Sequence, residues 1–206
     1  MGLYERYCWA PLLDFVMRQE PVTQQREKVV PRARGRVLEV GMGSGLNLAV
    51  YDRTRVTAIA GLEPSLPLRE VARARAGEAG LTVDFIGLDG EQIPADDRSF
   101  DTVVTTYTLC SIPDAPRALA EMRRVLKPDG QLLFAEHGVA PDAGIARWQH
   151  RVNGAWRVIS GGCNLDRAIP DLIRGAGFRI AELDALYLPG PKLLTYNYWG
   201  SAVPAS

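Results

Sequence analysis

The stretch VLEVGMGSGLN, residues 37–47, constrains the fold most strongly, because an apolar run leads directly into three glycines. This pattern is typical of a buried strand whose backbone turns tightly toward a nucleotide. Gly41, Gly43 and Gly45 read G-x-G-x-G, and Leu46 stands where the dinucleotide-binding fingerprint has its third glycine. The stretch therefore favours an adenosyl ligand without a pyrophosphate over a dinucleotide.

Short β-rich runs alternate with helical stretches along most of the chain that follows. The expected strands are 36–40, 57–63, 83–87, 100–106 and 131–135. The expected helices are one directly after Gly45, one over 66–79 and one over 115–126, and Lys127-Pro128-Asp129-Gly130 is expected to turn the chain into the fifth strand. This β-α-β-α order predicts an α/β fold in which helices cover both faces of a parallel sheet.

The two ends of the chain depart from that alternation. Residues 3–32 have the pattern of two short helices that are separated at Pro21, and residues 1–34 are expected to form a helical cap. Helical patterns over 138–162 and 166–174 precede two expected strands, 179–186 and 193–203. The short connection between these strands predicts an antiparallel hairpin at one sheet edge. No internal repeat or linker interrupts the sequence, so we expect one domain over residues 1–206.

Composition limits the partners and the compartment. The 24 basic and 24 acidic side chains balance, which gives no electrostatic reason to expect a nucleic acid. Cys8, Cys110 and Cys163 lack metal-site spacing, so we expect free thiols in a reducing compartment and no metal. Residues 1–10 lack the features of a signal peptide, and no apolar run approaches the ~20 residues of a membrane-spanning helix. We expect a soluble cytoplasmic protein.

Acidic residues follow the second and third expected strands. Glu63 lies about 20 residues beyond the glycine turn, where an acid accepts hydrogen bonds from ribose hydroxyls. A carboxylate at Asp89 can accept a hydrogen bond from an adenine amine, and Gly90 lets the backbone approach the ring. Both classes of nucleotide ligand need an acid at the position of Glu63, so the added support for an adenosyl ligand comes from Asp89 and Gly90.

Four motifs in order, VLEVGMGSGLN, GLEPS, LDGEQIPADDRSFDTVVTT and MRRVLKPDGQLL, resemble those of class I S-adenosylmethionine-dependent methyltransferases, in the methyltransferase type 11 superfamily. The resemblance implies a Rossmann-like, doubly wound seven-stranded sheet of order 3-2-1-4-5-7-6 with strand 7 antiparallel. It implies S-adenosylmethionine as the cofactor, with S-adenosylhomocysteine as its product. The cofactor residues that it implies are Glu39, Gly41, Gly43 and Gly45 around the methionine portion, Glu63 at the ribose, Asp89 and Gly90 at the adenine, Thr106 and Tyr107 at the sulfonium, with Ser44, Asn47, Pro64 and Glu91 beside them.

The second half, with TLCSI, FAEHG, RWQHRVNGAW, GGCNLDR and IRGAGF, resembles the alkyl thiol methyltransferase branch. This resemblance implies S-methylation of a small apolar thiol. Methylation of a quinone carbon or of a phospholipid amine remains an alternative, as does a catalytically silent protein that binds S-adenosylmethionine. The chain lacks the long apolar N-terminal anchor of the animal enzymes, so at most its first amphipathic helix touches a membrane. We expect a monomer or a weak dimer.

His137 directly follows the fifth strand and is the candidate general base, because imidazoles ordinarily titrate near neutrality. The alternative is a histidine that only bonds the backbone. The expected acceptor-side residues are Tyr7, His137, Trp148, Cys163 and Asn164, under a roof formed by the 138–165 insertion.

Other candidates have plainer interpretations. Cys110 and Cys163 are expected to be ordinary buried thiols, and His150 an ordinary surface or packing residue. Tyr4 and Tyr7 form a lid or pack in the core, and Asn164 and Arg167 reach the pocket or cap a helix. The charges of Arg69, Glu70, Arg73 and Arg75 are expected to form a solvated helix face.

Overall fold

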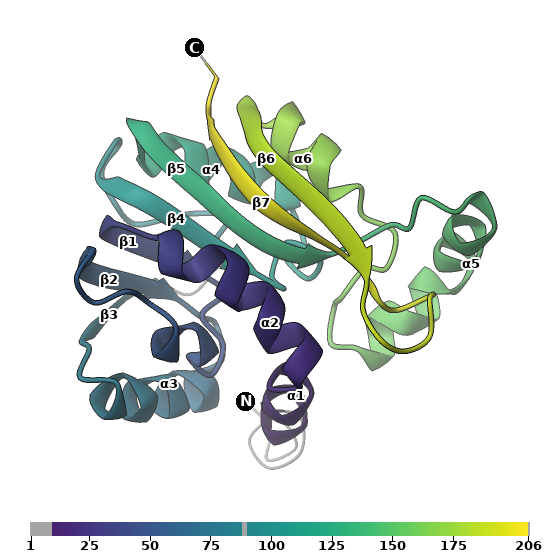
Figure 1. Cartoon of the computed structure of the whole chain (residues 1–206), viewed down its shortest axis with the longest axis horizontal. Helices are drawn as coiled ribbons and strands as arrows, with labels where there is room; N and C mark the ends of the chain where they lie inside the picture. Colours follow the sequence, from purple (N-terminus) through teal and green to yellow (C-terminus); the bar gives the residue numbers. More distant parts are fainter. Residues whose placement is uncertain (1–9, 88–89, 206) are drawn as a thin grey trace.

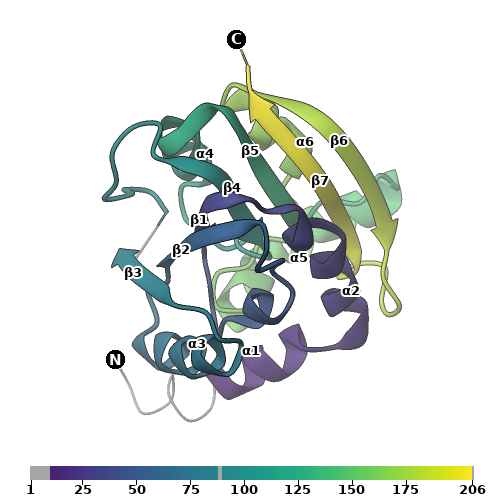
Figure 2. The same cartoon turned by 60° about the vertical axis from the view of Figure 1, so that its left-hand side comes forward.

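Seven strands form one mixed sheet through the middle of the protein, which is described here by a computed structural model over residues 10–87 and 90–205 (Figures 1 and 2). The strands are β1 (Gly35–Val40), β2 (Val56–Leu62), β3 (Val83–Gly87), β4 (Phe100–Thr106), β5 (Leu126–His137), β6 (Phe178–Tyr187) and β7 (Tyr196–Pro204). Their order is β3-β2-β1-β4-β5-β7-β6. β1 to β5 pair in parallel, whereas β7 is antiparallel to both β5 and β6. The predicted order, the antiparallel seventh strand and the edge hairpin are confirmed.

Helices cover both faces of this sheet. They are α1 (Ala10–Met17), α2 (Glu20–Val29), α3 (Leu66–Glu78), α4 (Ala115–Val125), α5 (Ala143–Ile159) and α6 (Ile169–Gly175), with 3₁₀ helices η2 (Val30–Arg32) and η3 (Leu46–Ala49). α4 and α6 pack on one face, and α2, η3 and α3 pack on the other. In Figure 1, α2 crosses in front of the sheet and α4 and α6 lie behind it, while α5 extends away from the strands.

Side chains that point alternately to the two faces of the sheet divide the strand residues between two hydrophobic cores. In β5, Leu132 and Phe134 pack with α4 and α6, whereas Leu133 and Ala135 pack on the face of α2 and α3. Successive side chains of a strand point to opposite faces, so a strand that is covered on both faces is apolar throughout. This explains why the β5 region reads as a continuous apolar run.

The prediction of an α-helix directly after Gly45 is wrong. The chain forms only the 3₁₀ helix η3 and enters β2 at Val56, after a turn in which Asp52 accepts hydrogen bonds from the N–H and hydroxyl of Thr54. The connection is too short for a packed α-helix. Val29 of α2 instead packs with Leu48 and Tyr51, so a helix from before the sheet covers this face.

The fifth strand begins earlier than expected, ahead of Lys127-Pro128-Asp129-Gly130. β5 already begins at Leu126, which pairs with Phe100, and the next pair is Gln131 with Thr102. The extra residues form an irregularity within the strand, because a bulge accommodates unpaired residues while pairing continues. None of the helices in the described ranges combines the length and the hydropathy that a membrane span requires.

Candidate active site

A cavity of about 470 Å³ lies at the carboxyl ends of the parallel strands, where the strand order reverses. β1 pairs with β2 on one side and with β4 on the other. The loops after β1 and β4 therefore leave the sheet in opposite directions, which creates the crevice in which α/β proteins bind ligands. The wall contains residues that directly follow β1, β2 and β4, among them Gly41, Glu63 and Tyr107.

The glycine loop forms the wall after β1 and requires glycine for specific reasons. Gly41 and Gly43 have positive φ angles of 71° and 58°. A Cβ at Gly41 would lie 2.2 Å from Oγ1 of Thr108, whereas a Cβ at Gly43 would meet nothing within 4 Å. Gly41 thus allows the β1 and β4 loops to approach, and Gly43 leaves open space.

Glu63 is held in a fixed position at the end of β2. It is 5% exposed and lines the cavity. Its Oε2 accepts a 2.8 Å hydrogen bond from the N–H of Gly43, and its Oε1 accepts one of 2.8 Å from the N–H of Ser65. The carboxylate is therefore oriented before a ligand arrives.

Glu39 does not line the cavity, unlike the direct cofactor contact expected for it. It is 1% exposed, and it accepts hydrogen bonds from the Tyr51 hydroxyl (2.7 Å) and from Nδ2 of Asn47 (3.0 Å). Burial raises the pKa of Glu39 to about 7. Asn47 lines the cavity and also donates to Oγ1 of Thr106 at 3.0 Å. Glu39 is thus a positioning residue that acts through Asn47.

Helix α1 covers part of the cavity. Leu13, Asp14 and Met17 line it, and Asp14 pairs with Arg75 at 2.7 Å and accepts a hydrogen bond from Ser44. Arg75 also donates to the backbone oxygen of Ser44 at 2.9 Å. These contacts connect α1 to the glycine loop and to α3, as in a lid. The expectation of a purely solvated face on α3 is therefore wrong at Arg75.

Arg26 is a cavity residue that the sequence did not reveal. It is 5% exposed and lines the cavity, and its guanidinium lies 5.2 Å from the ring centre of Tyr107. It donates to the backbone oxygen of Met17 at 2.8 Å, and its Nε is buried without a hydrogen-bond partner among the described residues. A buried cation with an unpaired N–H is an anion-binding feature. A charged residue within a polar helix gives no sequence signal for this.

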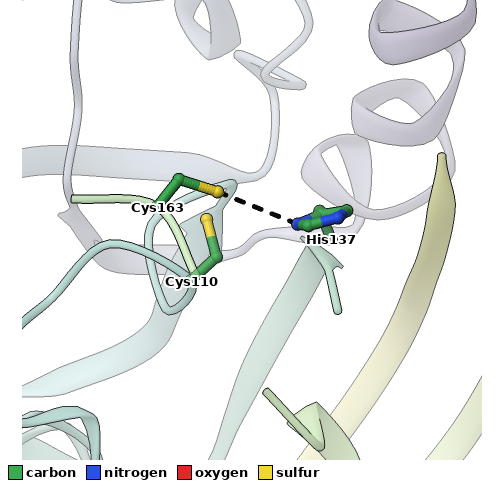
Figure 3. A group of neighbouring side chains, drawn as sticks. All are labelled: Cys110, His137 and Cys163. Carbon is green, nitrogen blue, oxygen red and sulfur yellow. Dashed lines mark hydrogen bonds between the residues drawn. The ribbon is translucent and has the colours of Figure 1, made fainter. Parts of the chain in front are cut away.

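Cys110, His137 and Cys163 meet beside the cavity although they are distant in the sequence (Figure 3). Sγ of Cys163 lies 3.9 Å from Nδ1 of His137. The hydrogen bond from Cys110 and the neighbouring His137 both lower the pKa of Cys163. The same hydrogen bond, together with burial, raises the pKa of Cys110. Cys110 is buried, as expected, whereas Cys163 is only partly buried, so the expectation of a buried thiol is confirmed for Cys110 and wrong for Cys163.

Glu136 organises the loop that carries Cys110. It is fully buried, accepts hydrogen bonds from the Thr105 hydroxyl (2.8 Å) and from the N–H of Thr108 (2.9 Å), and is also bonded by the N–H groups of Leu109 and Cys110. Burial raises the pKa of Glu136 to about 7. The signal for this loop was present in the TLCSI and FAEHG motifs.

The structure brings most of the expected cofactor residues together. Those that line the cavity are Gly41, Gly43, Ser44, Asn47, Glu63, Pro64, Gly90, Glu91, Thr106 and Tyr107. Gly45 is buried next to Leu48 and Ala72 and does not line it. Asp89, Tyr4 and Tyr7 lie outside the described residues.

The acceptor-side expectations are met only in part, since His137 and Cys163 are not among the residues that line the cavity. Trp148 is 57% exposed on α5, with the guanidinium of Arg151 5.4 Å from its ring centre, and it does not line the cavity because α5 extends away from the sheet. Of the 138–165 segment, only Ser160 and Gly161 line the cavity. Asn164 is a loop-fixing residue, since its N–H and its Nδ2 both donate to the backbone oxygen of Cys110 at 2.8 Å.

The two remaining polar candidates lie outside the cavity wall. His150 is a surface residue as expected, paired with Asp166 at 2.7 Å. Arg167 donates to the backbone oxygens of Leu109 and Pro113 and fixes the loop after β4.

Comparisons with known proteins identify the family and the fold. Residues 38–134 match the family model described as a methyltransferase domain. The chain is 32% identical to the thiol S-methyltransferase TMT1A of Homo sapiens, over 98% of this chain and 90% of that protein. It is 33% identical to a phosphatidylethanolamine N-methyltransferase of Cereibacter sphaeroides, over 50% of this chain and 51% of that protein. Geranyl diphosphate methyltransferase in complex with SAM shares the fold, with a TM-score of 0.73 at 15% identity over 100% of this chain and 92% of that chain.

Proposed function

Because the chain belongs to the S-adenosylmethionine-dependent methyltransferases, we propose that it methylates the sulfur of a small apolar thiol. The observation that carries the thiol is the extent of the likeness to TMT1A, which spans 98% of this chain. It therefore includes the segment after residue 134, beyond the match to the methyltransferase domain model, and this segment contributes Ser160 and Gly161 to the cavity wall.

S-adenosylmethionine is the cofactor, and the cavity wall fits it chemically. Glu63 offers a carboxylate for ribose hydroxyls. Oδ1 of Asn47 is buried without a partner among the described residues and suits an ammonium group, while Arg26 suits a carboxylate. We assign the amino-acid end of the cofactor to Asn47 and Arg26, and the ribose to Glu63.

The protein's contribution to this reaction is mainly alignment. When bound, S-adenosylmethionine supplies an electrophilic methyl group on a sulfonium. The acceptor's thiolate forms the new sulfur–carbon bond as the carbon–sulfonium bond breaks, and the electron pair stays on the departing sulfur. Holding the acceptor in line with that carbon supplies a large part of the rate enhancement.

The acceptor must lose a proton, because the thiolate is the nucleophile. We assign this proton to His137. It ends β5 at the carboxyl edge of the sheet, and its Nε2 has no hydrogen-bond partner in the part of the chain that the structure describes. Thiols ordinarily titrate near pH ~8.5, so a modest base suffices.

Release of S-adenosylhomocysteine over a panel of alkyl thiols, phenols, amines and quinones tests this proposal. We expect turnover with alkyl thiols. The amine alternative draws support from the phosphatidylethanolamine N-methyltransferase relative, which matches only half of the chain, and it predicts turnover with amines alone. A catalytically silent protein would bind the cofactor and release no product with any acceptor.

Peripheral membrane contact, the oligomeric state and a cytoplasmic location remain predictions.

A further inference from the structure

The loop after β4, the end of β5 and the loop after α5 bring two thiols and an imidazole to one point. Figure 3 shows the side chains of Cys110, His137 and Cys163 directed toward one another. Their ligand atoms all lie within 4.8 Å of one another, and the Cys163 Sγ to His137 Nδ1 distance is 3.9 Å. Cys110 is 4% and His137 7% exposed, so the group is largely shielded from solvent.

Two thiolates and an imidazole are the ligands that Zn²⁺ prefers. Zinc binds sulfur at about 2.3 Å and nitrogen at about 2.0 Å with tetrahedral geometry, which places ligand atoms ~3.6–3.8 Å apart. The observed separations, which are within 4.8 Å, need contractions of no more than ~1.2 Å to reach those values. Three protein ligands also leave one tetrahedral position open, which is the arrangement of catalytic rather than structural zinc sites.

The surrounding contacts hold the ligand-bearing segments together. Asn164 donates its N–H and its Nδ2 to the backbone oxygen of Cys110, at 2.8 Å each, which joins the two cysteine loops. His137 stands opposite Asn197 in the β5–β7 ladder, and both His137 Nε2 and Asn197 Oδ1 are buried without partners among the described residues. These two groups occupy one face of neighbouring strands. A metal-bound histidine needs an acceptor for its second ring nitrogen, and Asn197, which stands opposite His137 in the ladder, carries an acceptor oxygen.

We propose that Cys110, His137 and Cys163 bind one Zn²⁺ ion, whose open position takes the sulfur of the acceptor thiol. Ser111 and Gly161 line the cavity and lie next to the cysteine loops, so the open position borders the space in which the methyl acceptor would lie. The zinc site stands on the three side chains alone, whereas its role in acceptor binding rests on the proposed function.

In the metal-bound protein the thiol is ionised by the metal, and His137 is a ligand instead of a base. The acceptor's sulfur binds zinc and releases its proton to solvent, since coordination deprotonates a thiol outright. The bound thiolate then forms the bond to the methyl carbon, as described above. The product is a neutral thioether, a weaker ligand than a thiolate, so it leaves and the position opens again.

Metal titration of the reduced, chelator-treated full chain tests the site. We expect one equivalent of Co²⁺ to give tetrahedral absorption with intense thiolate-to-cobalt charge-transfer bands that Zn²⁺ removes. The chain contains three cysteines and two histidines, so Cys8→Ser and His150→Ala are matched controls that should keep this spectrum. Cys163→Ala and His137→Ala should weaken Zn²⁺ binding at least ~100-fold, since even residues that only orient metal ligands change affinity by about 10–100-fold.

A measurement on the unmutated protein guards against misfolded variants. Bound Zn²⁺ should protect Cys110 and Cys163, but not Cys8, from alkylation by N-ethylmaleimide, as read by mass spectrometry. Each of three results would overturn the proposed zinc site. They are the absence of charge-transfer bands, equal protection of all cysteines by Zn²⁺, and an unchanged Co²⁺ spectrum in Cys163→Ala.

The acceptor role has a separate readout. An alkyl thiol added to the Co²⁺ protein without cofactor should intensify the charge-transfer bands as a further sulfur binds. An unchanged spectrum would overturn the acceptor role and leave the metal site standing. If the protein methylates a thiol but binds neither Zn²⁺ nor Co²⁺, the zinc inference is overturned and the proposed function stands.

Discussion

The carboxylate of Glu63 accepts a 2.8 Å hydrogen bond from the backbone N–H of Gly43 and thereby joins the end of β2 to the glycine loop after β1. The N–H of Ser65 holds the other oxygen at 2.8 Å. The carboxylate is therefore preorganised at the edge of the cavity, where an acid meets the ribose of an adenosyl ligand.

Replacing Glu63 with glutamine should weaken S-adenosylmethionine binding about 10–100-fold, because hydrogen bonds to a charged group contribute about 1.5–3 kcal/mol. Isothermal titration calorimetry measures the effect. Glu78→Gln, at the exposed end of α3, is the matched control. Equal affinities of the two variants would show that Glu63 does not contact the cofactor.

Replacing Arg26 with methionine should weaken S-adenosylmethionine binding by at least ~10-fold, since the variant loses the charge-assisted bonds assigned to the cofactor's carboxylate. Binding of 5′-methylthioadenosine, which lacks that carboxylate, should stay within about twofold of the unmutated protein. A comparable loss for both ligands would contradict the assignment and indicate a general change in the cavity.

The stability of the protein should fall as the pH rises from about 4.5 to about 7. Burial raises the pKa of both Glu39 and Glu136 from 4.5 to about 7. The folded protein thus holds these protons more tightly than the unfolded chain does, so the stability they contribute is complete below the unfolded value and is lost as pH rises through the folded one. Urea unfolding should show a decrease on the order of 1–3 kcal/mol across this range.

The variant Glu39→Gln cannot titrate at this position, so its unfolding free energy should depend less on pH than that of the unmutated protein. Glu78→Gln should keep the full dependence. An equal pH dependence in Glu39→Gln and Glu78→Gln would contradict the burial of a titrating carboxyl group at position 39.

Replacing His137 with alanine should lower turnover of an alkyl thiol about 100-fold, a typical contribution of a positioned proton acceptor, while the cofactor dissociation constant stays nearly unchanged. His150→Ala should retain normal turnover, because that side chain is paired with Asp166 at the surface. Turnover by His137→Ala at the rate of His150→Ala would reduce His137 to a structural role.

The strands could be predicted because their physical causes are local, whereas their order in the sheet was implied by the resemblance of the motifs. Apolar runs such as the one ending at Val40, and punctuation such as Pro189-Gly190-Pro191, directly encode strands and their connections. The prediction of a helix after Gly45 was wrong for a non-local reason. Helix α2, which precedes the sheet in the sequence, covers the face on which the expected helix would have packed.

Several residues of the site come together through tertiary contacts that no local sequence pattern predicts. The glycine loop and Glu63 are encoded in short motifs, and the structure brings them together. Arg26 reaches the cavity only through the packing of α2, and Cys110, His137 and Cys163 meet only through the arrangement of three distant segments. Trp148 was misplaced because an aromatic residue in a helical pattern does not reveal which way the helix extends.

If this protein methylates the sulfur of an apolar thiol, the transferred methyl group must be found in a thioether. The protein is incubated with S-adenosylmethionine carrying a deuterated methyl group and an equimolar mixture of an alkyl thiol, an ethanolamine lipid and a quinol. Mass spectrometry of the products should find the label in the alkyl methyl thioether, with its formation matching the release of S-adenosylhomocysteine. Label in the amine or on the quinol ring, with none in the thioether, would contradict the account.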